Sequence, residues 1–187
     1  MYKRQILRFL LARMVYSDGL VTLFAFGGIY AAGTFGMEFA EVVRFGIALN
    51  VTAGIGALGF GWADDRYGAK RVILFSLAAL ILLGTVALLA QSKTAFWIAG
   101  VALGLFVGPV QSASRSMMAR LAPADMRTEM FGLYALSGKA TTFLGPVAFG
   151  WATAAFASQR AGMATILVFL ALGLLLMLPL PDPQRSQ

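Results

Sequence analysis

Two ionisable residues lie inside long apolar stretches of this sequence, where they could bind a polar solute or carry a proton. Asp18 lies about ten residues into the apolar run 9–36, and Lys139 about ten residues into the run 129–157. Ten residues of helix rise roughly 15 Å, about half the thickness of a bilayer's hydrocarbon core. A charge at that depth costs at least ~2.5–3.5 kcal/mol, so it must face a partner or water. The two residues either pair as a static ion bridge between helices or bind substrate and relay protons.

Four more polar residues could line a path for such a solute: Arg13, Asn50, Gln111 and Arg115. Arg13 lies nearer the end of its run than Asp18, so its long side chain could reach the membrane surface. Asn50 is the main polar group of the run 43–63. Gln111 and Arg115 follow Pro109, at which a helix can kink. For Gln111 and Arg115, lining a water-filled path and packing against a neighbouring helix remain equally open.

The composition argues against catalysis. The sequence has no Cys and no His, which removes disulfides, thiol chemistry, the usual zinc and haem ligands, and a serine–histidine triad. It also has no phosphate-binding loop motif. We therefore expect no enzyme, no catalytic residue, no metal site and no cofactor. The net charge of +7 is spread over short loops, so we expect no nucleic-acid partner either.

The elements that position these residues are predicted to be membrane helices. Hydrophobic residues make up 59% of the chain and charged residues 12%, and the mean hydropathy is +0.80. A soluble domain has about twice that charged fraction, so the bilayer must be the surrounding medium. We predict an all-α polytopic membrane protein, a single domain over 1–187. Its six spans fall at about 9–36, 43–63, 72–92, 94–116, 129–157 and 161–180.

The basic residues predict the orientation of these spans. An even number of crossings leaves both termini on one side, and basic loops stay cytoplasmic. With cytoplasmic termini, ten basic residues fall inside: Lys3, Arg4, Arg8, Arg66, Lys70, Arg71, Arg115, Arg120, Arg127 and Arg185. Three fall outside: Arg44, Lys93 and Arg160. We therefore expect a multi-pass protein of the plasma (inner) membrane, with cytoplasmic termini and a retained first helix.

Glycines predict close helix packing. Gly100, Gly104 and Gly108 recur every four residues and so share one helix face, which forms a groove for a neighbouring helix. Gly54, Gly56, Gly59 and Gly61 crowd the second span, and we expect them to serve packing rather than ligand contact.

A charged turn at 61–71 separates the second and third spans and is the candidate gating loop. Its Gly68 permits a positive φ, and its Gly61 would let another backbone come close. The loop pattern comprises Gly61, Asp65, Arg66, Gly68, Lys70 and Arg71. This spacing resembles the loop signature of the major facilitator superfamily, where the loop joins the second and third helices of each six-helix half.

Three further stretches extend the resemblance: 9–36, 108–115 and 131–146. Together they are similar to the C-terminal half of one branch of this superfamily, which is called the unidentified major facilitator family. That branch is related to the vacuolar effluxers linked to autophagy. The resemblance implies a half-bundle in which the first and fourth spans line a central cavity. The second and fifth then rock beside it, and the third and sixth face lipid. It also implies that Asp65 contacts a helix N-terminus and Arg66 while the inner gate is closed.

Members of this family have twelve helices, and this chain has six predicted spans. The resemblance therefore implies a homodimer or a pairing with a second six-helix half. We expect a half-size secondary transporter subunit that moves a small polar solute, with amino acids suggested by the effluxer resemblance. In this hypothesis Asp18 and Lys139 bind substrate or couple protons. Two alternatives remain open: a membrane interaction or assembly subunit that transports nothing, and a truncated remnant.

Overall fold

The computed structural model describes residues 2–181, and within them every regular element is helical. The helices are α1 (Tyr2–Phe35), α2 (Phe39–Tyr67), α3 (Ala69–Leu89), α4 (Lys93–Leu121), α5 (Arg127–Ser137), α6 (Leu144–Ala155) and α7 (Gln159–Met177). A short 3-10 turn, Ala124–Met126, precedes α5. The all-α prediction is confirmed. Arg185, counted above among the inside charges, lies outside the described residues.

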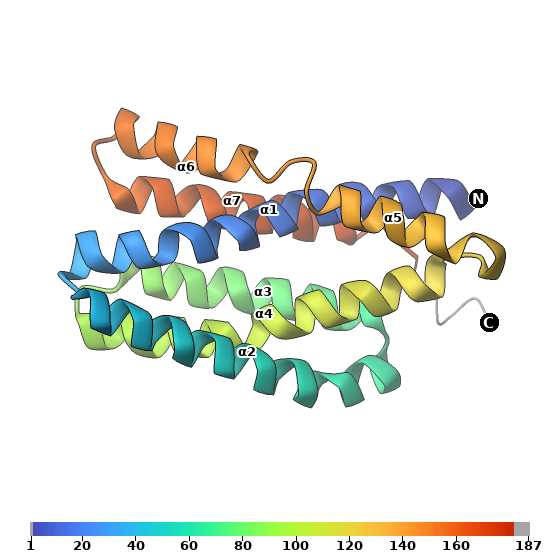
Figure 1. Cartoon of the computed structure of the whole chain (residues 1–187), viewed down its shortest axis with the longest axis horizontal. Helices are drawn as coiled ribbons and strands as arrows, with labels where there is room; N and C mark the ends of the chain where they lie inside the picture. The colour runs from blue at the N-terminus through green and yellow to red at the C-terminus, as the bar shows by residue number, and fades with distance from the viewer. Residues whose placement is uncertain (1, 182–187) are drawn as a thin grey trace.

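The helices form an elongated bundle in which the start of α1 and the end of α7 lie at the same end (Figure 1). The most extensive packing joins α2 with α4, α1 with α7, and α3 with α4. Fully buried side chains such as Phe9, Ile73, Met117 and Leu170 form a core between α1, α3, α4 and α7. This core positions α1 and α4 side by side, which matters for the site described below.

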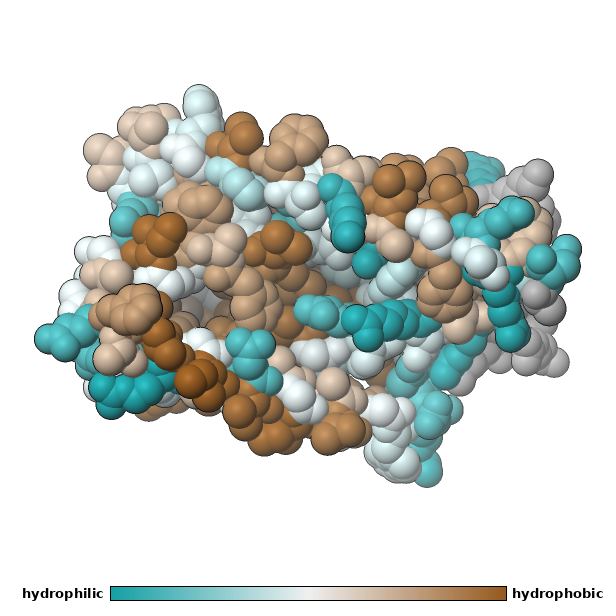
Figure 2. Space-filling model, in the orientation of Figure 1, coloured by the Kyte–Doolittle hydropathy of each residue, from teal (hydrophilic) through white to brown (hydrophobic). Residues whose placement is uncertain are grey.

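Five of the described helices, α1, α2, α3, α4 and α7, are long and apolar enough to cross a membrane. Their outer faces expose many large apolar side chains, for example Leu58 at 84% exposure and Ile98 at 67%. Soluble proteins rarely expose so much contiguous apolar surface to water. Figure 2 shows brown apolar side chains over much of the visible face, with teal polar ones at both ends and a smaller group near the middle. The chain is a multi-pass membrane protein whose outer surface contacts lipid.

The predicted span at 129–157 is not one helix, and this expectation was wrong. The chain leaves α5 after Ser137, runs through turns over 138–143, and re-enters helix at Leu144. Pro146 explains the break, because its ring clashes with the carbonyl of residue 142 and it has no N–H to donate. In the first turn of α6, where that N–H would be free anyway, proline is tolerated. The other five spans occur within several residues of the predicted limits.

The glycine predictions hold for α4 and mostly fail for α2. A side chain at Gly100, Gly104 or Gly108 would collide with residues of α2, so these three glycines form the predicted groove. In α2 a side chain at Gly56 would collide with the backbone of Leu105. Gly54, Gly59 and Gly61 face open space, so the close approach expected at Gly61 is absent. Gly68 has φ +94°, which confirms the predicted positive φ at the turn between α2 and α3.

Candidate functional site

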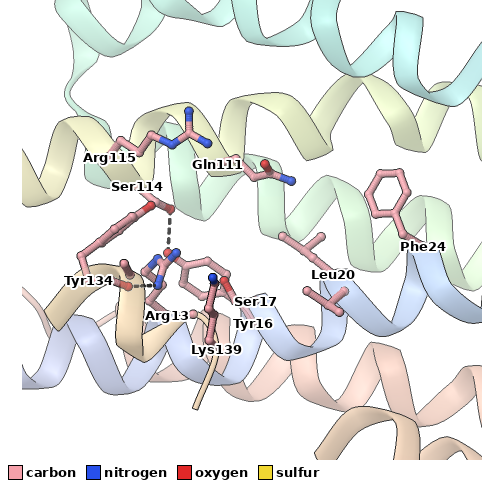
Figure 3. A pocket seen from close by; sticks show the side chains of 13 residues that line it. Arg13, Tyr16, Ser17, Leu20, Phe24, Gln111, Ser114, Arg115, Tyr134 and Lys139 are labelled. Carbon is pink, nitrogen blue, oxygen red and sulfur yellow. Dashed lines mark hydrogen bonds between the residues drawn. The ribbon is translucent and has the colours of Figure 1, made fainter. Parts of the chain in front are cut away.

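A cavity of about 500 Å³ lies between α1, α4, the end of α5 and the turn that follows it. Figure 3 shows its charged and polar side chains gathered at one end and Leu20 and Phe24 at the other. The lining residues are Arg13, Tyr16, Ser17, Leu20, Val21, Phe24, Gln111, Ser114, Arg115, Tyr134, Ala135, Gly138 and Lys139. Four of the six residues predicted to bind substrate, couple protons or line the path therefore share one cavity: Arg13, Gln111, Arg115 and Lys139.

Arg13 joins α1 to α5 across the wall of this cavity. Its Nη1 donates to the carbonyl oxygen of Tyr134 at 2.5 Å and to Ser137 Oγ at 2.8 Å. Its guanidinium lies 3.5 Å from the centre of the Tyr134 ring, a close cation–π contact. Gly138 allows this approach, since a side chain there would collide with the guanidinium. Arg13 is thus fixed in place by neutral groups, none of which cancels its charge.

Arg115, Gln111 and Lys139 are exposed toward the cavity. Arg115 and Gln111 are four residues apart and so share a face of α4, while Lys139 comes from the turn after α5. Among the described residues, neither Arg115 nor Lys139 forms an ion pair or a side-chain hydrogen bond. Gln111 and Arg115 both line this cavity, and their predicted role along a solute path stays a prediction.

Asp18 lies outside the cavity lining and is 1% exposed. Its Oδ2 accepts a hydrogen bond from the backbone N–H of Gly145 at 2.9 Å, in the first turn of α6. A carboxylate is favourable there because the N-terminus of a helix carries partial positive charge. Its other oxygen, Oδ1, is buried without a hydrogen-bond partner among the described residues. The structure has no Asp18–Lys139 ion bridge, so the static-pair interpretation is not supported.

Several residues of the site were missed by the sequence analysis. Tyr16 Oη and Ser114 Oγ are 2.7 Å apart in a buried hydrogen bond between α1 and α4. The carbonyl oxygen of Tyr134 and the hydroxyl group of Ser137 accept hydrogen bonds from Arg13. The helical spacing of Arg13, Tyr16, Ser17, Leu20 and Phe24 was a usable signal, because residues three or four apart share a face. No comparable signal in the sequence joins α1 to α5.

Asn50 is not among the residues that line this cavity. It is exposed on α2, and its side-chain Nδ2 donates to the carbonyl oxygen of Gly46 at 2.8 Å, one turn earlier. Its predicted role as a path-lining residue therefore stays a prediction.

The turn between α2 and α3 is tied to α4 by charge. Arg120 Nη1 lies 3.0 Å from Asp64 Oδ1, and its Nη2 lies 3.8 Å from Asp65 Oδ1. Asp64 is buried, and neither Asp64 nor Arg120 was named among the loop residues in the sequence analysis. Arg66 lies over the Trp62 ring at 5.4 Å from its centre.

Lys70 ties the same turn to the end of α7. Its Nζ donates to the carbonyl oxygen of Leu178 at 2.9 Å and also to that of Leu180. These carbonyls follow the last turn of a helix, where a cation is favourable. The predicted gating loop is therefore joined both to α4 and to the C-terminal end of α7.

Comparison with known proteins gives a consistent picture. A family profile described as "Vacuole effluxer Atg22 like" matches residues 1–186. The chain is 21% identical over 179 residues to the "Uncharacterized MFS-type transporter YxiO" of Bacillus subtilis, covering 96% of the chain and 42% of that protein. It is 27% identical over 199 residues to "Autophagy-related protein 22-1" of Aspergillus niger, covering 98% and 32%. The chain thus spans about a third to two-fifths of the length of these relatives.

Proposed function

The chain belongs to the Atg22-like vacuole effluxer family, and from this premise we propose that it forms one six-helix half of a major facilitator transporter. Paired with a second half, it moves a small polar solute across the membrane by alternating access. The second half is another copy of this chain or a second six-helix unit. In this proposal α5 and α6 count as one interrupted crossing, which brings the number of crossings to six.

The observation that carries this proposal is the polar cavity beside the interruption between α5 and α6. Transporters commonly place their substrate site near the membrane midplane, where a broken helix frees backbone groups and helix ends. Irregular backbone at that depth is tolerated where it lines a cavity or is buried in protein. A cavity bounded by α1 and α4 and by the broken element fits one side of such a site.

Three roles follow for the residues of this half. Lys139, Arg13, Gln111 and Arg115 contact the solute. Asp18 links proton or ion binding to the position of α6. A proton or ion that reached its unpartnered Oδ1 would change the hydrogen bond that Asp18 accepts from the Gly145 N–H. The turn at 61–71 closes the cytoplasmic side through the Asp64–Arg120 pair. We place the protein in the plasma (inner) membrane with both termini cytoplasmic, and amino acids are one candidate solute.

Cysteine accessibility in native membranes tests alternating access. The chain has no cysteine, so Gln111→Cys introduces its single thiol within the cavity. A membrane-impermeant thiol reagent should label this residue from either side of the membrane, and a transported solute should change both rates in opposite directions. As a control, Ile98→Cys on the lipid-facing surface should stay unlabelled. Labelling from one side under all conditions would contradict alternating access and favour a non-transporting assembly subunit.

A further inference from the structure

Within the described residues 2–181, the lining of the cavity contains three cationic side chains and no carboxylate. Arg13, Arg115 and Lys139 all line it, whereas no described Asp or Glu does. The nearest acidic residue along α1, Asp18, is directed to Gly145 of α6. We propose that this cavity binds a solute with an anionic carboxylate or phosphate group and an apolar body. This inference rests on the proposed transport function and names the class of solute.

Within the described part of the chain, none of these three cations forms an ion pair. Arg13 is held by a carbonyl oxygen, a hydroxyl group and an aromatic ring, all of which are neutral. Among the described residues the ion pairs join Glu41 with Lys93, and Asp64 and Asp65 with Arg120. None of these acids reaches the cavity. An unpaired cation within a membrane has a high free-energy cost. An anion that entered the cavity would pair with these cations and lower that cost.

The shape of the lining matches an anionic group joined to an apolar body. Arg115 and Lys139 stand at the polar end of the cavity, together with Gln111 and Ser17 (Figure 3). Arginine presents a planar fork that binds carboxylate or phosphate through two parallel hydrogen bonds. At the other end, Leu20, Val21 and Phe24 provide apolar surface.

The cavity is also long enough for such a solute. From Ser17 to Phe24 the helix rises roughly 10 Å, the length of a small ring with a short chain. The volume of about 500 Å³ leaves room for it.

A zwitterionic amino acid fits this lining less well. Its ammonium group would need an acceptor of opposite charge, and the described lining supplies only neutral acceptors such as the Gln111 and Ser17 side chains. The same ammonium would lie in the field of three cations, which is repulsive. A net-negative solute avoids both costs. The charge of the head group is therefore the property that this half selects.

Direct binding measurements test this selection. The chain, purified gently with any associated chains, is placed in phosphatidylcholine nanodiscs, and calorimetry follows probes that share one body. The probes are 3-phenylpropionate, phenyl phosphate, 3-phenylpropanamide, 3-phenylpropylammonium and phenylalanine. The two anions should bind at least about ten-fold more tightly than the amide and phenylalanine, and the ammonium should not bind.

Matched variants locate the binding. Lys139→Gln and Arg115→Gln should each weaken 3-phenylpropionate about ten-fold, since each removes one charge-assisted contact. Arg44→Gln removes an equal charge from the exposed surface of α2 and should leave binding unchanged. The double variant Lys139→Glu with Arg115→Glu leaves Arg13 against two carboxylates, so the lining becomes net negative and should reverse the preference toward 3-phenylpropylammonium. This reversal keeps the test meaningful even if one neutral variant is poorly folded.

The outcomes separate this inference from the transport proposal. If phenylalanine or the amide binds as tightly as 3-phenylpropionate, the cavity takes a solute but the anion assignment falls. If none of the probes binds, or if Arg44→Gln weakens binding as much as Lys139→Gln, the assignment also falls. Transport itself is judged independently by the accessibility of Gln111→Cys.

A second set of nanodiscs containing phosphatidylglycerol identifies the source of the anion. Competition by this lipid would mean that a lipid headgroup supplies the anion, whereas unchanged binding means a free solute. Either result leaves the anionic chemistry of the site in place.

Discussion

At the scale of residues, the site separates two tasks that a membrane-buried charge can perform. Asp18 stabilises structure by accepting the Gly145 N–H across the gap between α1 and α6. A side chain at Gly145 would collide with Thr22 and crowd Asp18, so only glycine permits this approach. Lys139 has no such structural contact and is exposed to the cavity. Asp18 therefore stabilises the start of α6, whereas the Lys139 side chain is accessible from the cavity.

Two substitutions at Asp18 should separate its structural role from its charge. Asp18→Asn keeps an oxygen for the Gly145 N–H, so the protein should fold nearly as well while proton or ion coupling is lost. Asp18→Ala removes the acceptor and should lower the free energy of unfolding by about 1.5–3 kcal/mol. Thermal unfolding and solute transport in vesicles are measured for both variants. Full transport by Asp18→Asn would contradict a coupling role.

At the scale of elements, small residues decide how closely α2 and α4 approach. Gly104 and Gly108 on α4 and Gly56 on α2 lie against the opposite helix, where an added Cβ would collide with backbone or side-chain atoms. Lipid offers helices little hydrophobic reason to associate, so close packing of this kind supplies much of the attraction. The pairing of α2 with α4 thus depends on a few positions and not on overall composition.

Paired glycine substitutions test this dependence. Gly56→Ala should destabilise the protein by about 1–3 kcal/mol, because the new methyl group would overlap the Leu105 backbone. Gly54→Ala, two residues away on the same helix, faces open space and should be neutral or slightly stabilising. The unfolding midpoint in increasing denaturing detergent reports both. Equal effects of the two changes would refute the packing assignment.

The turn between α2 and α3 should act as a latch on the cytoplasmic side. Asp64→Asn breaks its ion pair with Arg120, and labelling of Gln111→Cys from that side should then rise several-fold. The exchanged pair Asp64→Arg with Arg120→Asp should restore slow labelling. Glu41→Gln, which breaks the described pair at Lys93, provides the control and should leave the cytoplasmic rate unchanged. If Asp64→Asn and Glu41→Gln gave the same rate of cytoplasmic labelling at Gln111→Cys, the latch role would be contradicted.

At the scale of the whole molecule, the bundle has two chemically different ends. The start of α1, the turn at Gly68 and the segment after α4 lie at one end (Figure 1). Most of the described basic residues belong to these segments. The turns before α2, α4 and α7 lie at the other end. The cavity lies between α1, α4 and α5 and ends at the break before α6. In the proposed transporter, a second half must cover this face.

Single cysteines at the two ends should give opposite labelling. Asp125→Cys should react with an impermeant reagent only from the cytoplasmic side, and Gln91→Cys only from the outside. Both positions are exposed, and the chain has no other thiol. Intact cells and inside-out vesicles give the two rates. Labelling in the reverse sense would overturn the proposed orientation.

The sequence by itself determined the class of structure and the approximate limits of the five long apolar helices. Each apolar run responds to the bilayer over its own length, and basic residues at its ends resist transfer. The glycine face of α4 could also be inferred, because it follows from the period of one helix. The break within 129–157 was missed, although Pro146 carried the signal for it.

Only the tertiary structure decided which residues meet. The Asp18 contact with Gly145, the Arg13 contacts with Tyr134 and Ser137, and the Asp64–Arg120 pair all join positions far apart in the chain. They depend on how each helix is rotated about its axis and how far it slides along its neighbour. Neither quantity is fixed by a helix's own sequence, because packing against other helices sets both. For that reason the charged residues could be named in advance, but the three-cation cavity could not.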